Sequence, residues 1–151
     1  LHIKETFPEH LQVLQEASIF ESFGRYLFVH AGIDPTVPLS SQTLFDLLQI
    51  RDKFLDHVGP LSHVVVHGHS PTNTHLPVVT ENRVSLDTGA VHSDVLTMAV
   101  IDTDSNTLEF YSTDRSGSVR KAHPTIIDRG LGTIWHSHPR KASIDEHHSL
   151  N

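Results

Sequence analysis

The chain has 151 residues, enough for one domain with a hydrophobic core, and its formal net charge of −7 argues against binding to nucleic acid or to an anionic membrane. It contains no cysteine, which excludes disulfides, a thiolate metal site and a cysteine nucleophile, so a bound metal would need imidazole, carboxylate or amide ligands. No apolar run approaches the length of a membrane helix and no signal peptide is visible, so we expect a cytoplasmic protein.

The first third of the chain predicts two helices around one strand. Residues 6–23 predict a helix and a short turn, with apolar residues near helical spacing after the start signals Thr6 and Pro8. Residues 24–33 predict a buried strand that breaks at glycine. A proline-rich loop follows. Residues 41–59 predict the best helix of the chain, closed by the Gly-Pro pair that follows Val58. Its expected inward residues are Leu44, Leu47, Leu48, Phe54, Leu55 and Val58.

The rest of the chain predicts strands. Residues 63–69 form a fully apolar run of the parallel-sheet type. Residues 77–90 predict a hairpin that turns at Glu81 and Asn82, and residues 95–112 predict a second, antiparallel hairpin that turns at 104–106. Residues 113–151 are polar and rich in His, Ser and Gly. We therefore expect a mixed α/β (α+β) domain over 1–112 and a C-terminal extension over 113–151, partly disordered or wrapped over the domain.

Two of the fourteen histidines occupy equivalent places. His30 follows the apolar run "YLFV", His69 follows "VVVHG", and small residues that break a strand come next in each case. Binding sites in open α/β sheets form at the carboxyl ends of the strands, and glycine there allows close approach of a ligand. Because two separate strands bring a histidine to this edge, we predict that His30 and His69 bind a metal ion.

The other paired histidines are less informative. Side chains at i and i+2 of a strand share a face, so His67 could join His69 on one ion or bracket two ions. Alternatively, His67 supports a ligand or is a core histidine bonded to the backbone. The pairs His136/His138 and His147/His148 have no strand context, and we expect them to be solvated.

Arg51 lies in the middle of the predicted second helix, between Ile50 and Asp52. An arginine in this setting is usually exposed or ion-paired. Its planar guanidinium is also suited to bidentate binding of phosphate oxygens. Hydrophobic periodicity does not choose between these roles.

Four segments in this order, "YLFVHAGID", "IRDKFL", "VVHGHSPT" and "VSLDTGAVHSDVLTMAVID", resemble the C-terminal half of the calcineurin-like metallophosphoesterases. The nearest branch is the bacterial serine/threonine protein phosphatases, which are similar to the diadenosine tetraphosphatases. The resemblance covers residues 8–112. The ordered set is specific, whereas Gly-His-Ser-Pro alone would be a weak signal.

The resemblance implies a two-sheet β-sandwich flanked by helices, with two divalent metal ions (manganese, iron or zinc) at its edge. It implies that His30 and His69 bind metal and that Arg51 contacts the substrate phosphate. It places Asp87, with Thr88 and Gly89, in a structural turn beneath the site and gives Asp87 no catalytic role. In such enzymes a water activated by both metals attacks phosphorus in line. The implied substrate is a phosphorylated protein or a small phosphate ester.

The sequence departs from the family pattern in one major respect. It contains no Gly-Asp and no Asn-His dipeptide, so the family's Gly-Asp-x-x-Asp-Arg and Gly-Asn-His-Glu motifs, which carry most of the ligands, are missing. We therefore expect the chain, which begins at Leu1, to start just after the last of these motifs and to lack significant phosphatase activity alone. Hydrolysis of dinucleoside polyphosphates, or a truncated domain kept as an interaction module or metal buffer, are the alternatives. Uncovered sheet edges would favour a homo-oligomer.

Overall fold

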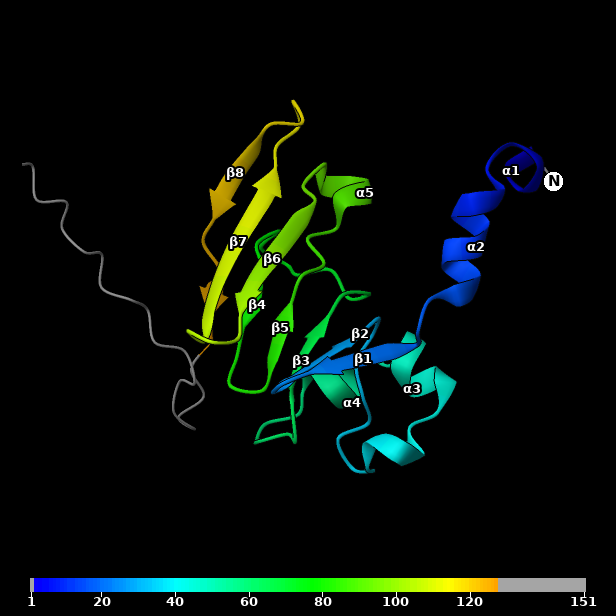
Figure 1. Ribbon diagram of the computed structural model, residues 1–151. Coiled ribbons are helices and arrows are strands. Elements are labelled where there is room, and N and C mark those ends of the chain that lie inside the picture. The colour runs from blue at the N-terminus through cyan, green and yellow to red at the C-terminus, as the bar shows by residue number, and fades with distance from the viewer. Residues whose placement is uncertain (1, 128–151) are drawn as a thin grey trace, which may run out of the picture.

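The computed structural model describes residues 2–127 and contains two β-sheets with a few short helices (Figure 1). The six-stranded sheet has the order β1-β2-β3-β5-β4-β9, and the three-stranded sheet has the order β6-β7-β8. The strands of the six-stranded sheet are β1 (Phe20–Phe23), β2 (Tyr26–Val29), β3 (Val64–His67), β4 (Val78–Val79), β5 (Arg83–Ser85) and β9 (Thr125–Ile126). Those of the three-stranded sheet are β6 (Thr97–Asp102), β7 (Thr107–Thr113) and β8 (Val119–Ala122). A sheet-rich α/β protein is thus confirmed.

The helices are short and lie outside the sheets. They are α1 (His2–Thr6), α2 (Pro8–Glu16), α3 (Leu44–Gln49), α4 (Asp52–Leu55) and α5 (Ala90–Ser93), with one 3-10 turn at Leu39–Ser41. In Figure 1, α3 and α4 lie against the six-stranded sheet, whereas α1 and α2 project away from the rest of the molecule. None of the helices in the described part of the chain is long and apolar enough to cross a membrane.

Strands β2, β3 and β5 form the parallel centre of the large sheet. Phe28 is level with Val66, and Val66 is level with Val84. Valine-rich runs suit this position because central parallel strands are covered on both faces. All four residues of β3 are buried, as the sequence predicts.

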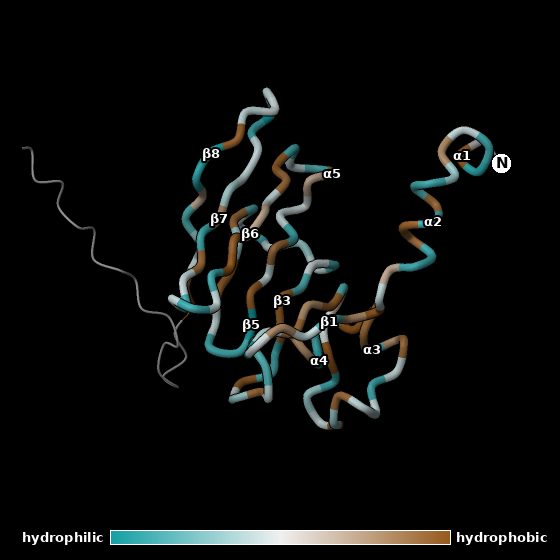
Figure 2. Tube along the Cα trace, in the orientation of Figure 1, coloured by the Kyte–Doolittle hydropathy of each residue, from teal (hydrophilic) through white to brown (hydrophobic). Residues whose placement is uncertain are grey.

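Each face of the central strands packs into its own hydrophobic cluster. Leu27, Val29 and Val65 meet the buried side chains of α3 and α4 on one face. Tyr26 and Val66 pack towards the three-stranded sheet on the other face, where Phe110 closes the core. The hydropathy pattern follows this arrangement, with apolar segments along the central strands (Figure 2). The protein is therefore a β-sandwich with helices on one outer face.

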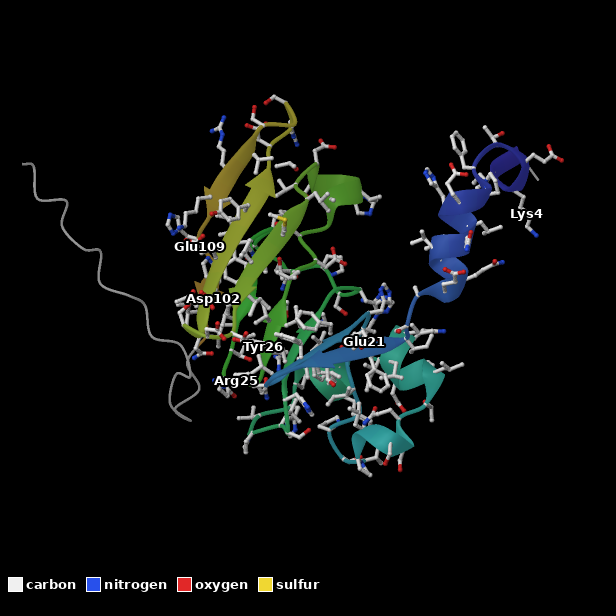
Figure 3. All side chains as sticks on the ribbon, viewed as in Figure 1. Lys4, Glu21, Arg25, Tyr26, Asp102 and Glu109 are labelled. Atoms are coloured by element: carbon white, nitrogen blue, oxygen red, sulfur yellow. The ribbon has the colours of Figure 1, made fainter. Side chains whose placement is uncertain are left out.

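Two contacts join the sheets away from the core. The Tyr26 hydroxyl, at the start of β2, donates a hydrogen bond to Asn106 Oδ1 in the β6–β7 turn at 3.2 Å. Figure 3 shows Tyr26 and its neighbour Arg25 at this end of the sheet. At the opposite side, β8 pairs with β7 and β9 pairs with β4, so the chain passes from one sheet to the other within two residues.

Both predicted helices are wrong in part. Residues 20–23 form β1 instead of the end of the predicted helix and turn, because a turn at Gly24 pairs them antiparallel with β2. The helix predicted over 41–59 is divided into α3 and α4 by non-helical backbone at Ile50 and Arg51. This break lets both Ile50 and Phe54 reach the buried cluster, whereas Leu44 and Val58 are exposed. Tertiary pairing and packing override helix spacing in both places.

The predicted boundary at residue 112 falls inside β7. Residues 119–126, assigned to the extension, contribute β8 and β9 to the two sheets. The predicted hairpins over 77–90 and 95–112 are confirmed as β4–β5 and β6–β7. The histidine pairs His136/His138 and His147/His148 lie outside the described residues.

Candidate functional site at the carboxyl edge of the central strands

The parallel strands bring His30 and His69 together. Each follows the end of a central strand, β2 or β3, and the Gly68 amide donates to the His30 carbonyl at 2.9 Å. His30 Nε2 lies 3.2 Å from His69 Nδ1, and the ring planes are inclined by 59°. His30 is exposed and His69 is partly buried. The structure thus places the two predicted ligands in direct contact at the expected edge.

The local backbone geometry orients the His69 side chain. His69 has φ 64°, in the left-handed region, so the chain turns sharply where β3 has ended. Partial burial, followed by the positive charge of Arg51 and the His30 ring, lowers the pKa of His69, while a hydrogen bond to the Gln49 backbone acts in the opposite direction. The neutral imidazole is therefore favoured, and this is the form that binds a metal ion.

The separation of the two ring nitrogens is that of a hydrogen bond between them, and it also suits two nitrogens that share one ion. With metal–nitrogen bonds of about 2.1 Å, two nitrogens lie about 3.0 Å apart at right angles and about 3.4 Å apart on a tetrahedral ion. The observed 3.2 Å falls in this interval. However, the described residues contain no group of three or more His, Asp or Glu side chains that could hold a metal. The two imidazoles therefore fit part of a metal site and do not complete one.

Arg51 approaches the same edge from the helical side. It occupies the break before α4, and its Nη1 lies 3.4 Å from the hydroxyl of Ser70, which is buried next to His69. The Arg51 side chain is exposed. Its predicted position within a helix is wrong, because the backbone there is not helical. The break places Arg51 where its side chain reaches Ser70, the residue after His69.

His67 belongs to the core. It is 3% exposed, its Nε2 lies 2.7 Å from the Ser85 hydroxyl, and its Nδ1 lies 3.0 Å from the Gly68 carbonyl oxygen. Its ring meets Phe54 edge-on, with centroids 5.0 Å apart. Burial lowers the pKa of His67 to about 4. Of the roles considered for His67, the structure supports the core histidine, since both ring nitrogens have partners within the protein.

A tight turn at residues 87–89 follows strand β5 near the site. The Asp87 carboxylate accepts a hydrogen bond from the Gly89 amide at 2.8 Å, and Gly89 has φ 70°. Thr88 is buried and donates to the Val95 carbonyl. Asp87 is thus engaged in a structural turn. Sequence reasoning missed Ser70 and the Gln49 backbone. Ser70 could have been noted as the neighbour of His69, but no sequence signal marks Gln49.

Comparison with known proteins finds no relative of this chain. No family model, no curated protein and no solved structure matches the chain. The functional argument therefore rests on the sequence motifs and on the arrangement of the site.

Proposed function

We propose that this chain forms one side of the active site of a metal-dependent phosphatase of the calcineurin-like, serine/threonine protein phosphatase type. The observation that supports it best is the convergence of His30 and His69 with Arg51 at one strand edge. Three residues that the resemblance selects come from separate segments and lie at the same edge. The described residues hold no group of three or more side chains that could complete the site, so the proposal covers one part of it.

Each residue has a definite task in this proposal. His30 and His69 present imidazole nitrogens to a divalent ion. Arg51 leaves its long contact with Ser70 and binds two oxygens of the substrate phosphate, because a guanidinium matches that geometry and carries a permanent charge. A pair of divalent ions in such a site supplies an activated water and neutralises phosphate charge. Manganese, iron and zinc all suit imidazole and oxygen ligands.

Metal binding by the chain alone tests the first part of the proposal. Calorimetric titration with Mn²⁺ or Zn²⁺ uses the full chain with its tail histidines replaced by glutamine, so that they do not contribute. Binding at the site should be weak, since two imidazoles make a poor cage. Replacing either His30 or His69 by alanine should abolish it. His92→Ala on α5, which alters another exposed histidine, is the matched control. Unchanged binding after loss of both His30 and His69 would refute the assignment.

Hydrolysis measurements test the rest. The chain alone should show no significant Mn²⁺-dependent turnover of a phosphate ester, and strong turnover would contradict an incomplete site. In a complete protein that restores activity, a phosphopeptide should be cleaved in preference to a dinucleoside polyphosphate. The opposite preference would support the diadenosine polyphosphate hydrolase alternative. Arg51→Lys should raise KM for the phosphate substrate, because lysine keeps the charge and loses the fork.

A further inference from the structure

Arg51 lies between two places where the helical segment 44–55 is attached to the loop that follows β2. Before Arg51, the Ala31 amide donates a hydrogen bond to the Leu47 carbonyl of α3 at 2.9 Å. After Arg51, Gly32 lies against the Phe54 ring of α4, so closely that an added Cβ would come within 2.3 Å of it. Both attachments come from the two residues directly after the first histidine of the pair. The loop that carries one side of the candidate site therefore also supports the other side.

A third attachment of the same loop uses charge. The buried Asp34 carboxylate forms an ion pair with the ammonium group of Lys53, the second residue of α4, and we call this ion pair the clamp. Its acidic member is also held from its own loop. The Thr36 amide and hydroxyl donate to Asp34 Oδ1 at 2.9 and 2.7 Å, and the Gln42 side chain bonds to the Asp34 amide and carbonyl. The Lys53 ammonium, followed by the Thr36 donors, lowers the pKa of Asp34 to about 2, so the carboxylate stays charged at neutral pH.

The first turn of α4 needs such an attachment. This helix has only four residues, and a helix this short draws its stability from tertiary contacts. Arg51 precedes it with φ −133° and ψ −104° and without a side-chain cap. The far end of α4 is held by Arg83, which donates to the Leu55 carbonyl. Phe54 anchors the helix in the core, and Lys53 lies about 100° away around the helix axis, so the clamp restrains rotation about that anchor.

Arg51 moves with this first turn. Its carbonyl accepts hydrogen bonds from the amides of Phe54 and Leu55, both at 2.9 Å, so the orientation of the turn sets the direction in which the Arg51 side chain leaves the backbone. The guanidinium is exposed, and its contact with the Ser70 hydroxyl is long, at 3.4 Å. A side chain held this loosely at its tip depends on its backbone for its position.

We propose that the Asp34–Lys53 clamp positions Arg51 for binding of the substrate phosphate. Neither clamp residue touches the phosphate, and both act through the backbone of α4. An ion pair with an exposed lysine usually contributes little to stability, and the Lys53 side chain is 56% exposed. The effect of the clamp is geometric instead, because a misplacement of about 1 Å can cost about a hundredfold in rate. The inference rests on the proposed phosphate-binding role of Arg51.

Amide hydrogen exchange tests the clamp on the full chain without any phosphate. Asp34→Asn removes the charge that binds Lys53, keeps an acceptor for the neighbouring donors, and leaves the sequence of α4 unchanged. The two amides that bond to the Arg51 carbonyl should exchange about tenfold faster in this variant. Lys121→Ala is the matched control, because it removes another ion pair, on β8, whose lysine side chain is also 56% exposed. Equal exchange in Asp34→Asn and the parent chain would overturn the proposal.

Titration with inorganic phosphate, followed by the side-chain Nε signal of Arg51 in a heteronuclear NMR spectrum, tests the functional consequence. Asp34→Asn removes a negative charge, so a purely electrostatic effect would strengthen phosphate binding, whereas loss of the clamp should weaken it about fivefold. Lys53→Arg should keep the affinity within about twofold of the parent, because arginine can restore the ion pair. Equal or tighter binding by Asp34→Asn would overturn the clamp alone. A parent chain whose Arg51 signal does not respond to phosphate would overturn both the proposed role of Arg51 and this inference.

Discussion

Replacing Gly32 by alanine should destabilise the protein far more than the same change at Gly68. Gly32 lies two residues after His30 and has φ 152°. A Cβ built there would lie 2.3 Å from Phe54 Cδ1 and 2.8 Å from Cγ of the same ring. At Gly68 the nearest atom would be the His30 carbonyl oxygen at 3.8 Å, an ordinary contact. Both glycines lie beside the candidate site, so they form a matched pair.

The Phe54 ring has no room to withdraw. It is fully buried, meets the edge of His67 with centroids 5.0 Å apart, and has the Arg83 guanidinium 5.6 Å from its centroid. Overpacking a filled core typically costs about 1–3 kcal/mol, and holding alanine at this φ adds about 1–3 kcal/mol. We therefore expect Gly32→Ala to lose about 3 kcal/mol of unfolding free energy, which corresponds to a fall in Tm of about 10 °C.

Urea unfolding followed by far-ultraviolet circular dichroism measures both variants against the parent chain. Gly68→Ala should remain within about 0.5 kcal/mol of the parent, as substitutions without strain or clash usually do. Gly32→Ala should shift the midpoint without a large change of slope. If the two variants were equally stable, the packing of Phe54 against Gly32 would not be the constraint described here.

Three further measurements follow from the core and the helix caps. Burial lowers the pKa of His67 to about 4, below the ordinary value near 6.5, so the unfolded state binds the proton more tightly. The free energy of unfolding should therefore fall as pH drops from 6.5 towards 4, by about 2 kcal/mol at pH 5. The pH profile of His67→Phe should lack this loss, and an unchanged profile would count against the assignment. Ser85→Ala should cost about 1–3 kcal/mol in urea unfolding, because His67 Nε2 is left buried without a partner, whereas a cost near zero would mean that the bond is dispensable. Thr43→Ala should cost about 1 kcal/mol, since Thr43 and Asp46 form a capping box at the start of α3, and equal stability in thermal melts would contradict that role.

The position of the histidine pair could be predicted because it depends on regular structure. Apolar runs predicted two buried strands, the second of the parallel-sheet type, and parallel strands end at the same edge. With Phe28 level with Val66, His30 falls beside Gly68 and reaches His69. Nothing more than strand direction and register was needed.

The role of His67 and the break at Arg51 depend on local backbone that the pattern does not reveal. The argument that His67 and His69 share a face holds only while the strand continues, but β3 ends at His67 and His69 adopts a positive φ. Likewise, residues 41–59 carry helical spacing throughout, and only the extended backbone of Ile50 shows that the helix stops. Such deviations arise from tertiary packing, which single-sequence periodicity does not contain.

The short connection between β8 and β9 makes the two sides of the sandwich unequal in how easily the sheets can separate. Because only two residues separate these strands, a short covalent connection holds the two sheets together along one side. Separation of the sheets must then begin at the opposite side, where β1 and β6 are the outermost strands. Side chains between the sheets near β1 and β6 should therefore become accessible to solvent before those near β8 and β9. His30 follows β2, the strand next to β1, so opening at that side would also expose the candidate site.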